Sequence, residues 1–428
     1  MLLMILLFLI LLFLNIPVAF AIGISSALYF IMDPSLPNNL AVQQFATGTQ
    51  SFPLLAVPFF VLAGHILNVS GITSRLIKFS NDLTGHLTGG LAHVSIVLSA
   101  MMGGISGSAT ADAAMQSRIL TPDMMKRGYS KGFSIGVIAV SSLITATIPP
   151  SIGLILYGFI GGVSISRLFM AGIIPGILIT LVLMVTVYIV SKKNGYDQSI
   201  ENKKPSFKQL MISFKDSIWA LLFPVILIVG IRFGVFSASE GGAVAVIYAM
   251  LVGFFIHKEL DWKKLKKSLT DSVADNSMIM LIIAAAAMFS YIIAYENVPR
   301  SMSHLLTGIT ENATILLLII LFIVFIAGLF MEATANNLLL TPIFLPIVEQ
   351  AGVDPVHFGI LLVVLITLGG MTPPLGVTMF AVLSITKTSI TEYTKGALPF
   401  LIAVIMLLVL MVFFPQITLF FPNLLLGK

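Results

Sequence analysis

Two short segments place glycines and oxygen-bearing side chains inside runs too apolar for water. Residues 103–114 have the sequence GGISGSATADAA, and residues 328–337 have the sequence GLFMEATANN. Glycine costs about 1 kcal/mol relative to alanine inside a helix, and a carboxylate at bilayer depth costs roughly 2.5–3.5 kcal/mol or more. We therefore expect the first helix to break at residues 104–107 and restart near Ala109, leaving carbonyl and hydroxyl oxygens free to bind a ligand.

The two segments are related by a shift of 224 residues, from Gly104 to Gly328. The shift pairs residues 109–112 (ATAD) with residues 333–336 (ATAN). Without a gap it also pairs Pro149 and Pro150 with Pro373 and Pro374. A period of half the chain excludes a short solenoid repeat and indicates an internal duplication. Consecutive prolines remove two amide donors, so each copy also contains a helix that must unwind.

Hard oxygens at such breaks are suited to Na⁺, while the start of a half-helix presents amides and a positive dipole end to an anion. We predict three groups of site residues. The first sodium site comprises Ser106, Ser108, Thr145, Ile148 and Pro150; the second comprises Gly328, Glu332, Gly369 and Thr372; a carboxylate substrate between them would contact Thr110, Asp112, Thr334 and Asn336.

Several of these residues have a plainer interpretation. Ser106 and Ser108 could simply let helices pack closely. Asp112 and Glu332 occupy non-equivalent positions, and a carboxylate near a half-helix start could cap it or serve as a scaffold. Thr110 and Thr334 could equally be packing residues. The six histidines have no metal-ligand spacing and the chain has no cysteine, so Na⁺ is the only metal ion expected.

The elements that must position these residues are membrane spans. Hydrophobic residues make up 58% of the chain and charged residues 10%, against about 25% charged in a soluble globule. The predicted fold is an all-α polytopic membrane protein with two inverted-topology repeats, each with a re-entrant helical hairpin and a broken helix. This is the pattern of secondary transporters with a site near mid-membrane.

The predicted division has three parts. Residues 1–190 form the first repeat, with its hairpin at 92–125 and its broken helix at 133–162; residues 191–238 form a cytoplasmic linker and an extra span; residues 239–428 form the second repeat, with its hairpin at 313–349 and its broken helix at 356–385. The extra span lets the second copy enter the membrane upside down relative to the first.

Lysines and arginines set the expected orientation. Residues 2–31 are expected to form one span with a cytoplasmic N-terminus, and the loop at residues 33–51, which lacks Lys and Arg, should be periplasmic. Residues 72–87 have the spacing of an interfacial amphipathic helix. A last span at residues 397–421 would leave the C-terminus periplasmic.

The paired motifs, GGISGSATADAA with ATIPPS and GLFMEATANN with GGMTPPLG, resemble the large membrane subunit of TRAP transporters, the tripartite ATP-independent periplasmic uptake systems. The resemblance covers essentially the whole chain. It implies a sodium-driven, elevator-type symporter in the bacterial inner membrane. It also implies a separate small four-helix membrane subunit and a periplasmic binding protein that delivers an organic acid. The chain is most similar to sialic-acid members, and a C4-dicarboxylate is the alternative substrate.

Other functions have less support. A stand-alone divalent-anion/Na⁺ symporter could use similar hairpins without a binding protein. A channel usually places re-entrant loops around a symmetric oligomeric pore, whereas both copies here lie in one chain. No nucleophile and base pair, nucleotide loop or metal cluster suggests an enzyme. Nucleic acid and an organic cofactor are not expected, and lipid is the expected surrounding.

Overall fold

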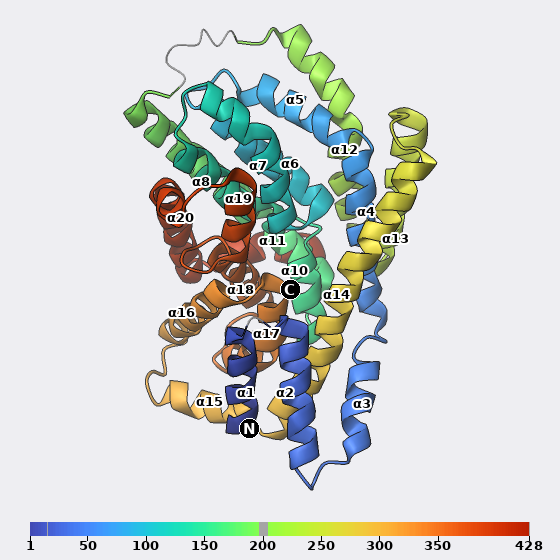
Figure 1. The fold of residues 1–428 in the computed structure, drawn as a ribbon, viewed down its shortest axis with the longest axis vertical. Helices are drawn as coiled ribbons and strands as arrows, with labels where there is room; N and C mark the ends of the chain where they lie inside the picture. The colour runs from blue at the N-terminus through green and yellow to red at the C-terminus, as the bar shows by residue number, and fades with distance from the viewer. Residues whose placement is uncertain (15, 197–203, 428) are drawn as a thin grey trace.

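The computed structural model describes residues 1–14, 16–196 and 204–427. Within these ranges the chain forms helices and no strand (Figure 1). Among the described residues, seven helices are long and apolar enough to cross a membrane, or eight if a bent pair counts as one span. The predicted fold class, an all-α polytopic membrane protein, is confirmed.

The helices fall into two successive groups along the chain. Those before the connection at residues 195–206 are α1 (Leu2–Phe13), α2 (Val18–Met32), α3 (Asn38–Thr47), η1 (Phe52–Leu55), α4 (Ala56–Val69), α5 (Ile72–Thr84), α6 (Gly90–Ser106), α7 (Ala109–Lys126), α8 (Lys131–Ser141), α9 (Leu143–Thr147), α10 (Ile152–Gly161) and α11 (Ile165–Asn194). Those after it are α12 (Phe207–Arg232), α13 (Ala238–Leu251), the π-helix η2 (Val252–Ile256), α14 (Trp262–Tyr295), α15 (Val298–Thr307), α16 (Ala313–Phe330), α17 (Ala333–Gln350), α18 (Pro355–Gly369), α19 (Val377–Thr386), α20 (Ile390–Phe413) and α21 (Gln416–Leu426).

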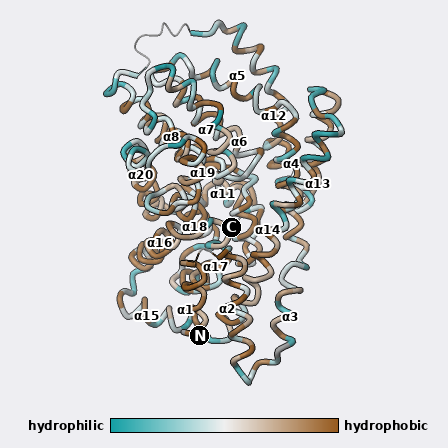
Figure 2. Tube along the Cα trace, viewed as in Figure 1, coloured by the Kyte–Doolittle hydropathy of each residue, from teal (hydrophilic) through white to brown (hydrophobic). Residues whose placement is uncertain are grey.

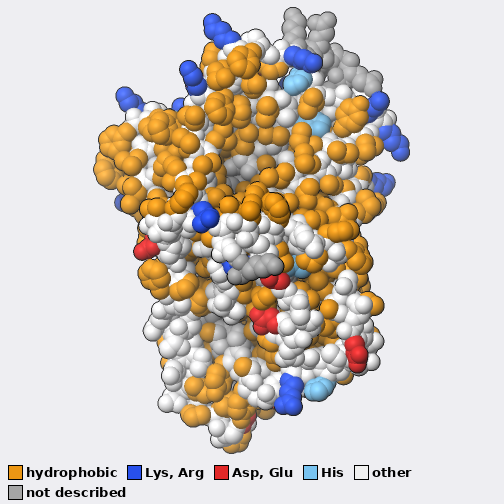
Figure 3. All heavy atoms as spheres, turned by 180° about the vertical axis from the view of Figure 1, so that it is seen from behind, with side chains coloured by type: hydrophobic (Ala, Val, Ile, Leu, Met, Phe, Trp, Pro, Cys, Tyr) orange, Lys and Arg blue, Asp and Glu red, His pale blue; other side chains and the backbone are white. Residues whose placement is uncertain are grey.

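The molecule is elongated, with polar chain at its two ends and apolar helices between them (Figures 1 and 2). One end carries α5, the start of α12 and the end of α11, and the other carries α1, α2, α3 and α15. Lysine and arginine side chains gather at the first of these ends, which we call the basic end (Figure 3). The end of α11 and the start of α12, which flank the predicted linker, lie at this end, and residues 197–203 lie outside the described part of the chain.

The expectation of one span at residues 2–31 is wrong. α1 ends at Phe13 and α2 begins at Val18, with Pro17 as its N-cap, and the two helices pack side by side as a hairpin (Figure 1). Proline has no N–H and its ring clashes with the preceding turn, so a helix ends before it. The Met1 amino group lies 3.8 Å from Glu296, which follows α14, and Tyr29 donates a hydrogen bond to the same carboxylate.

This hairpin puts the N-terminus and the loop at residues 33–51 at the same end of the molecule. A cytoplasmic N-terminus and a periplasmic loop at residues 33–51 therefore cannot both hold. The loop also contains a helix, α3. The single last span is wrong as well: α20 ends at Phe413 and α21 begins at Gln416, after Pro415.

Each broken helix is interrupted at its proline pair. α9 ends at Thr147 and α10 begins at Ile152, and the two parts of this span are bent by 46°. In the other copy α18 ends at Gly369 and α19 begins at Val377. The pairs Pro149–Pro150 and Pro373–Pro374 both have a cis peptide bond.

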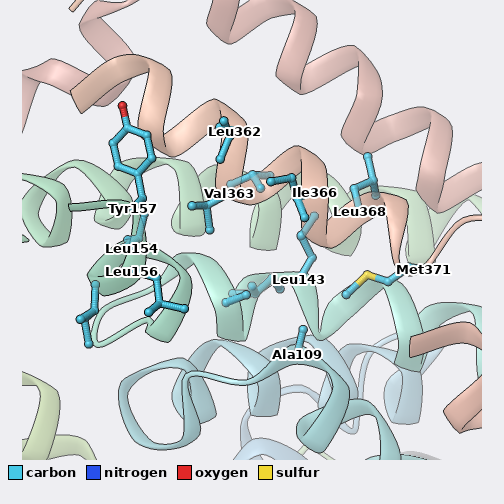
Figure 4. Close-up of a cluster of buried hydrophobic side chains, with 14 of the residues drawn as sticks. Ala109, Leu143, Leu154, Leu156, Tyr157, Leu362, Val363, Ile366, Leu368 and Met371 are labelled. Atoms are coloured by element: carbon cyan, nitrogen blue, oxygen red, sulfur yellow. The ribbon is translucent and has the colours of Figure 1, made fainter. Parts of the chain in front are cut away.

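The two broken helices pack against each other in the centre of the molecule. Figure 4 shows Val363 and Ile366 of α18 facing Leu143 of α9 and Leu154 of α10, and all four are almost completely buried. Inside a membrane, where lipid is as apolar as these side chains, such a contact is stabilised by close van der Waals packing. The centre of the fold is therefore an apolar contact between segments about 220 residues apart in the sequence, and the candidate site lies around it.

Candidate functional site: two hairpin tips at two helix breaks

The first hairpin is formed by α6 and α7, which run antiparallel. Ser95 Oγ donates to Gln116 Oε1 at 2.6 Å and Ser99 Oγ donates to Asp112 Oδ2 at 2.7 Å, so residues farther back in α6 pair with residues farther along α7. The turn at the tip needs Gly107, whose φ of +59° is a left-handed conformation that glycine adopts without a penalty. α7 then begins at Ala109, as expected.

This tip touches the break of the first broken helix. A Cβ added at Gly107 would lie 2.8 Å from the Pro150 carbonyl oxygen, and one added at Gly103 would lie 2.8 Å from Ile148 Cβ. The structure thus brings Ser106 and Ser108, on either side of Gly107, next to Ile148 and Pro150. Four of the five residues predicted for the first sodium site are therefore neighbours.

The oxygens at this tip are weakly engaged. Ser106 Oγ accepts from the Ser108 amide, and Ser108 Oγ caps α7 by accepting from the Ala111 amide, both at 3.4 Å. Good N–H···O hydrogen bonds are about 2.7–3.2 Å long, so both hydroxyls keep most of their acceptor capacity. Pro149 and Pro150 cannot donate to the carbonyls four residues earlier, which leaves the Thr145 carbonyl without its usual helical donor.

The Thr145 hydroxyl belongs to a different group of contacts. It donates towards Asp112 Oδ2 at 2.8 Å and the Ser99 carbonyl oxygen at 3.0 Å. Gln116 Nε2 adds a hydrogen bond of 3.0 Å to Asp112. Asp112 is 1% exposed, so its carboxylate ties α7 to α6 and α9 inside the protein. This geometry favours the scaffold interpretation of Asp112 over direct substrate contact.

The second hairpin is closed by the side chains of Glu332 and Asn336. Glu332 caps α17 by accepting from the amides of Thr334 at 2.8 Å and Ala335 at 3.3 Å, and it also accepts from the Thr334 hydroxyl. Glu332 therefore performs the capping role that the sequence had left open. Asn336, the counterpart of Asp112, donates to the carbonyl oxygens of Ala327 and Met331.

Asn336 has one further property. The side chain is fully buried, yet its Oδ1 accepts no hydrogen bond from the described residues. A buried acceptor without a partner costs about 1–3 kcal/mol, and native structures contain few of them. This oxygen is available to a ligand that supplies positive charge.

Gly328 and Gly369 bring the second hairpin against the second broken helix. A Cβ added at Gly369 would lie 2.6 Å from the Gly328 carbonyl carbon, and one added at Gly328 would lie 3.1 Å from the Ile366 carbonyl oxygen. The backbones of α16 and α18 are thus in direct contact. Thr372 lies just beyond, in the break, and its hydroxyl donates to the Leu368 carbonyl oxygen at 2.8 Å.

The restarting half of each hairpin contacts the broken helix of the other copy. Thr110 of α7 and Thr378 of α19 share a hydrogen bond of 2.7 Å, and Asn337 of α17 donates to the Gly153 carbonyl oxygen in α10 at 2.7 Å. The helix pairs α7 with α19 and α17 with α10 pack together. The predicted substrate residues Thr110 and Thr334 are partly exposed, whereas Asp112 and Asn336 are buried.

Sequence reasoning missed the polar side chains that position the site. Gln116, Ser95 and Ser99 join Asp112, and Thr378 and Asn337 connect the two copies. One signal was present: Ser95 and Ser99, and likewise Asp112 and Gln116, are four residues apart and share a helix face.

Residues 5–417 match the family model described as "Tripartite ATP-independent periplasmic transporter, DctM component". This chain belongs to the DctM family. The resemblance recognised from the paired motifs is thereby confirmed, and the protein is a transporter subunit and not an enzyme.

Relatives within the DctM family differ in the substrate that their names give. The chain is 39% identical over 420 residues to the sialic acid TRAP transporter permease protein SiaT of Haemophilus influenzae, covering 98% of this chain and 68% of that protein. It is 37% identical over 417 residues to the sialic acid TRAP transporter large permease protein SiaM of Vibrio cholerae, covering 97% of both. It is 33% identical over 404 residues to the C4-dicarboxylate TRAP transporter large permease protein DctM of Pseudomonas aeruginosa, covering 94% of both.

A solved transporter structure of low sequence identity has a similar fold. The YdaH transporter of Alcanivorax borkumensis, described as having an unusual topology, superimposes with a TM-score of 0.65 at 15% identity and covers 91% of both chains. At this identity the similarity concerns the fold alone.

Proposed function

We propose that this large TRAP permease is a sodium-coupled symporter that imports a carboxylate substrate delivered by a periplasmic binding protein. Sialic acid is the favoured substrate and a C4-dicarboxylate the alternative. The observation that carries the proposal is the contact of the Gly107 tip with the Pro150 carbonyl oxygen. This contact joins two polar, irregular segments inside an apolar protein, and such segments at membrane depth are tolerated where they bind or line something.

Sodium would bind at the two hairpin tips. At the first tip, the Ser106 and Ser108 hydroxyls and the unwound backbone at Ile148 and Pro150 supply hard oxygens, and carbonyls at broken helices coordinate Na⁺ in other secondary transporters. At the second tip, the unpartnered Oδ1 of Asn336 lies in the segment that holds Gly328 and Glu332. The oxygen atoms available as ligands at both tips support Na⁺ as the coupling ion.

The substrate carboxylate would lie between the starts of α7 and α17, near the hydroxyls of Thr110 and Thr334. Helix N-termini favour anions because their first amides are free and the helix dipole is positive there. Asp112 and Asn336 would hold their hairpins and not contact the substrate, because both are buried. Sialic acid is preferred because two of the named relatives carry it in their names.

Two inverted repeats and an elevator movement fit the packing. The base of the first hairpin lies near α5 at the basic end, and the base of the second lies beside α15 at the other end, where Ser303 contacts Gln350 at 3.3 Å. α7 packs against α19 of the second copy, and α17 packs against α10 of the first. These contacts would keep both tips and both breaks in one unit that moves together. The predicted divisions at residues 1–190, 191–238 and 239–428 remain part of this proposal.

The proposed setting is the bacterial inner membrane with the basic end in the cytoplasm, following the positive-inside rule. Under this orientation the N-terminus lies on the periplasmic side. A small four-helix membrane subunit and a periplasmic binding protein would complete the transporter.

Uptake of labelled sialic acid into proteoliposomes tests the proposal. The vesicles contain this chain with its small subunit and binding protein, with or without an inward Na⁺ gradient. We expect uptake to require Na⁺ and the binding protein, to fall at least tenfold in Ser106→Ala with Ser108→Ala, and to persist in the control Ser301→Ala on α15. Uptake without the binding protein would favour a stand-alone symporter. Na⁺-dependent uptake of a dicarboxylate but not of sialic acid would change only the substrate.

A further inference from the structure

A groove at the basic end lies outside the two hairpin tips. It has a volume of about 480 Å³ and is lined by three helices. Its lining residues are Ser74, Ile77, Lys78 and Asn81 of α5, Leu91 and Val94 of α6, and Ile119, Leu120, Asp123, Lys126 and Arg127, which lie on α7 or directly follow it.

The spacing of these residues shows how the groove is built. Ser74, Ile77, Lys78 and Asn81 follow the i, i+3, i+4, i+7 spacing of a helix and share one face of α5. The opposite face of that helix buries Ile72, Leu76 and Phe79 in the protein. Because α5 and α7 both pack against α6, the first two form the walls of the groove and α6 forms its floor.

The lining divides into an apolar part and a basic part. Leu91 and Leu120 are buried, and Ile119 is 42% exposed. The basic part has three cations against one acidic residue, Asp123. Lys126 is paired with Asp123 at 2.9 Å and Lys78 with Asp216 at 3.6 Å, while Arg127 has no ion pair within the described residues.

We propose that this groove binds an anionic phospholipid, with its phosphate on Arg127 and the two lysines and an acyl chain along Ile119 and Leu91. An apolar wall beside a basic rim matches a lipid whose headgroup is charged, and α5 has the amphipathic character of a helix at the membrane surface. A free phosphate would gain nothing from the apolar wall. The site is separate from the hairpin tips, so it does not depend on the proposed transport function.

Binding is measured on the full purified chain by native mass spectrometry, titrating phosphatidylglycerol and phosphatidylcholine with identical acyl chains. We expect phosphatidylglycerol to bind more tightly. The variant Lys126→Gln with Arg127→Gln should bind it about 10- to 30-fold more weakly, since each basic residue near an anionic headgroup contributes appreciably. The matched variant Lys266→Gln with Lys267→Gln removes two exposed charges from α14 and should change the affinity less than twofold.

Two further arms separate a lipid from a free anion. Ile119→Ser should weaken phosphatidylglycerol binding, and millimolar glycerol phosphate should not displace the lipid. Equal affinity for the two lipids, an equal loss in the α14 control, or displacement by glycerol phosphate would overturn the proposal. If the double variant does not fold, Arg127→Gln alone gives the test, because this side chain has no ion pair to lose in the described structure.

Discussion

Gly107 is the residue at which the first hairpin meets the broken helix, and its environment gives a sharp prediction. Gly107→Ala adds a methyl group in a left-handed conformation, which costs about 1–2 kcal/mol, and directs it to within 2.8 Å of the Pro150 carbonyl oxygen. We expect Na⁺-dependent uptake in proteoliposomes to fall at least tenfold.

Gly128→Ala is the matched control for this change. Gly128 has a φ of +83°, but nothing lies within 4 Å of an added Cβ. This variant should lose the stability that the left-handed conformation costs, without the clash, and should keep its uptake. Equal uptake in the two variants would show that the contact at the tip has no part in transport.

His257 follows the η2 helix at the basic end and gives a pH prediction. Burial lowers the pKa of His257, while its Nδ1 lies 2.9 Å from the Ser70 carbonyl oxygen. The folded state therefore favours the neutral ring, and its stability contribution is present above the unfolded pKa of about 6.5 and lost as the pH falls below it.

We expect the thermal midpoint of the wild type in detergent to drop more between pH 7.5 and pH 5.5 than that of His257→Gln, which cannot gain a proton. Parallel pH curves for the two proteins would contradict this account. The comparison is made between the two curves because other groups titrate in both proteins.

At the residue scale, the sequence predicted part of the arrangement at the first hairpin tip. Ser106, Ser108, Ile148 and Pro150 were expected to meet and are neighbours, because glycine and proline break helices through local sterics that the sequence displays. The hydrogen bonds of Asp112 were not foreseen. Its partners Ser99 and Thr145 lie 13 and 33 residues away, and such contacts depend on how helices pack.

At the scale of elements, the contact between α16 and α18 gives a second prediction. Gly369→Ala places a Cβ within 2.6–2.9 Å of three backbone atoms of Gly328. Backbone atoms cannot move aside as a flexible side chain can, and overpacking typically costs about 1–3 kcal/mol. We expect a lower thermal midpoint and reduced Na⁺-dependent uptake.

Gly23→Ala in α2 is its control. There the added Cβ would lie 3.7 Å from Ala285 Cβ, an ordinary contact, and alanine favours a helix over glycine by about 1 kcal/mol. This variant should be as stable as the wild type or more stable. A loss of stability in the control equal to that of Gly369→Ala would mean that the close backbone contact is not the cause.

Element boundaries were predictable where several breakers coincide and less so where one stands alone. The first hairpin and the proline pairs carry repeated glycines or prolines, and the helices end there, whereas the second hairpin turns at Met331 and Glu332 without either. Pro17 and Pro415 are single prolines in long apolar runs, which also fit a tilted or kinked span of the right length. Packing of α1 against α2 and of α21 against α11 decided these cases.

At the scale of the whole molecule, orientation in the membrane is the open prediction. The chain has no cysteine, so single cysteines report accessibility without background. We expect Asn39→Cys in α3 to react with a membrane-impermeant maleimide in cells whose outer membrane has been made permeable, and Lys193→Cys at the basic end to react only after the inner membrane is opened. The opposite pattern would invert the proposed orientation.

The all-helical fold and the membrane location followed from composition, because a chain with 10% charged residues cannot cover a soluble surface. The placement of the N-terminus did not follow. It depended on whether the first apolar run crosses once or folds back, and that is fixed by contacts such as the one between Tyr29 and Glu296, 267 residues apart.

The hydrogen bond between Thr110 and Thr378 has a consequence for how this protein is made. The two residues are 268 positions apart, so α7 reaches the membrane well before its neighbour α19 exists. At a synthesis rate of about 5–20 residues per second, the delay is roughly 15–50 s. During that time the Thr110 hydroxyl has no Thr378 to bond with, and the face of α7 that will pack on α19 is covered by lipid, water or the insertion machinery until the ribosome has delivered the second half.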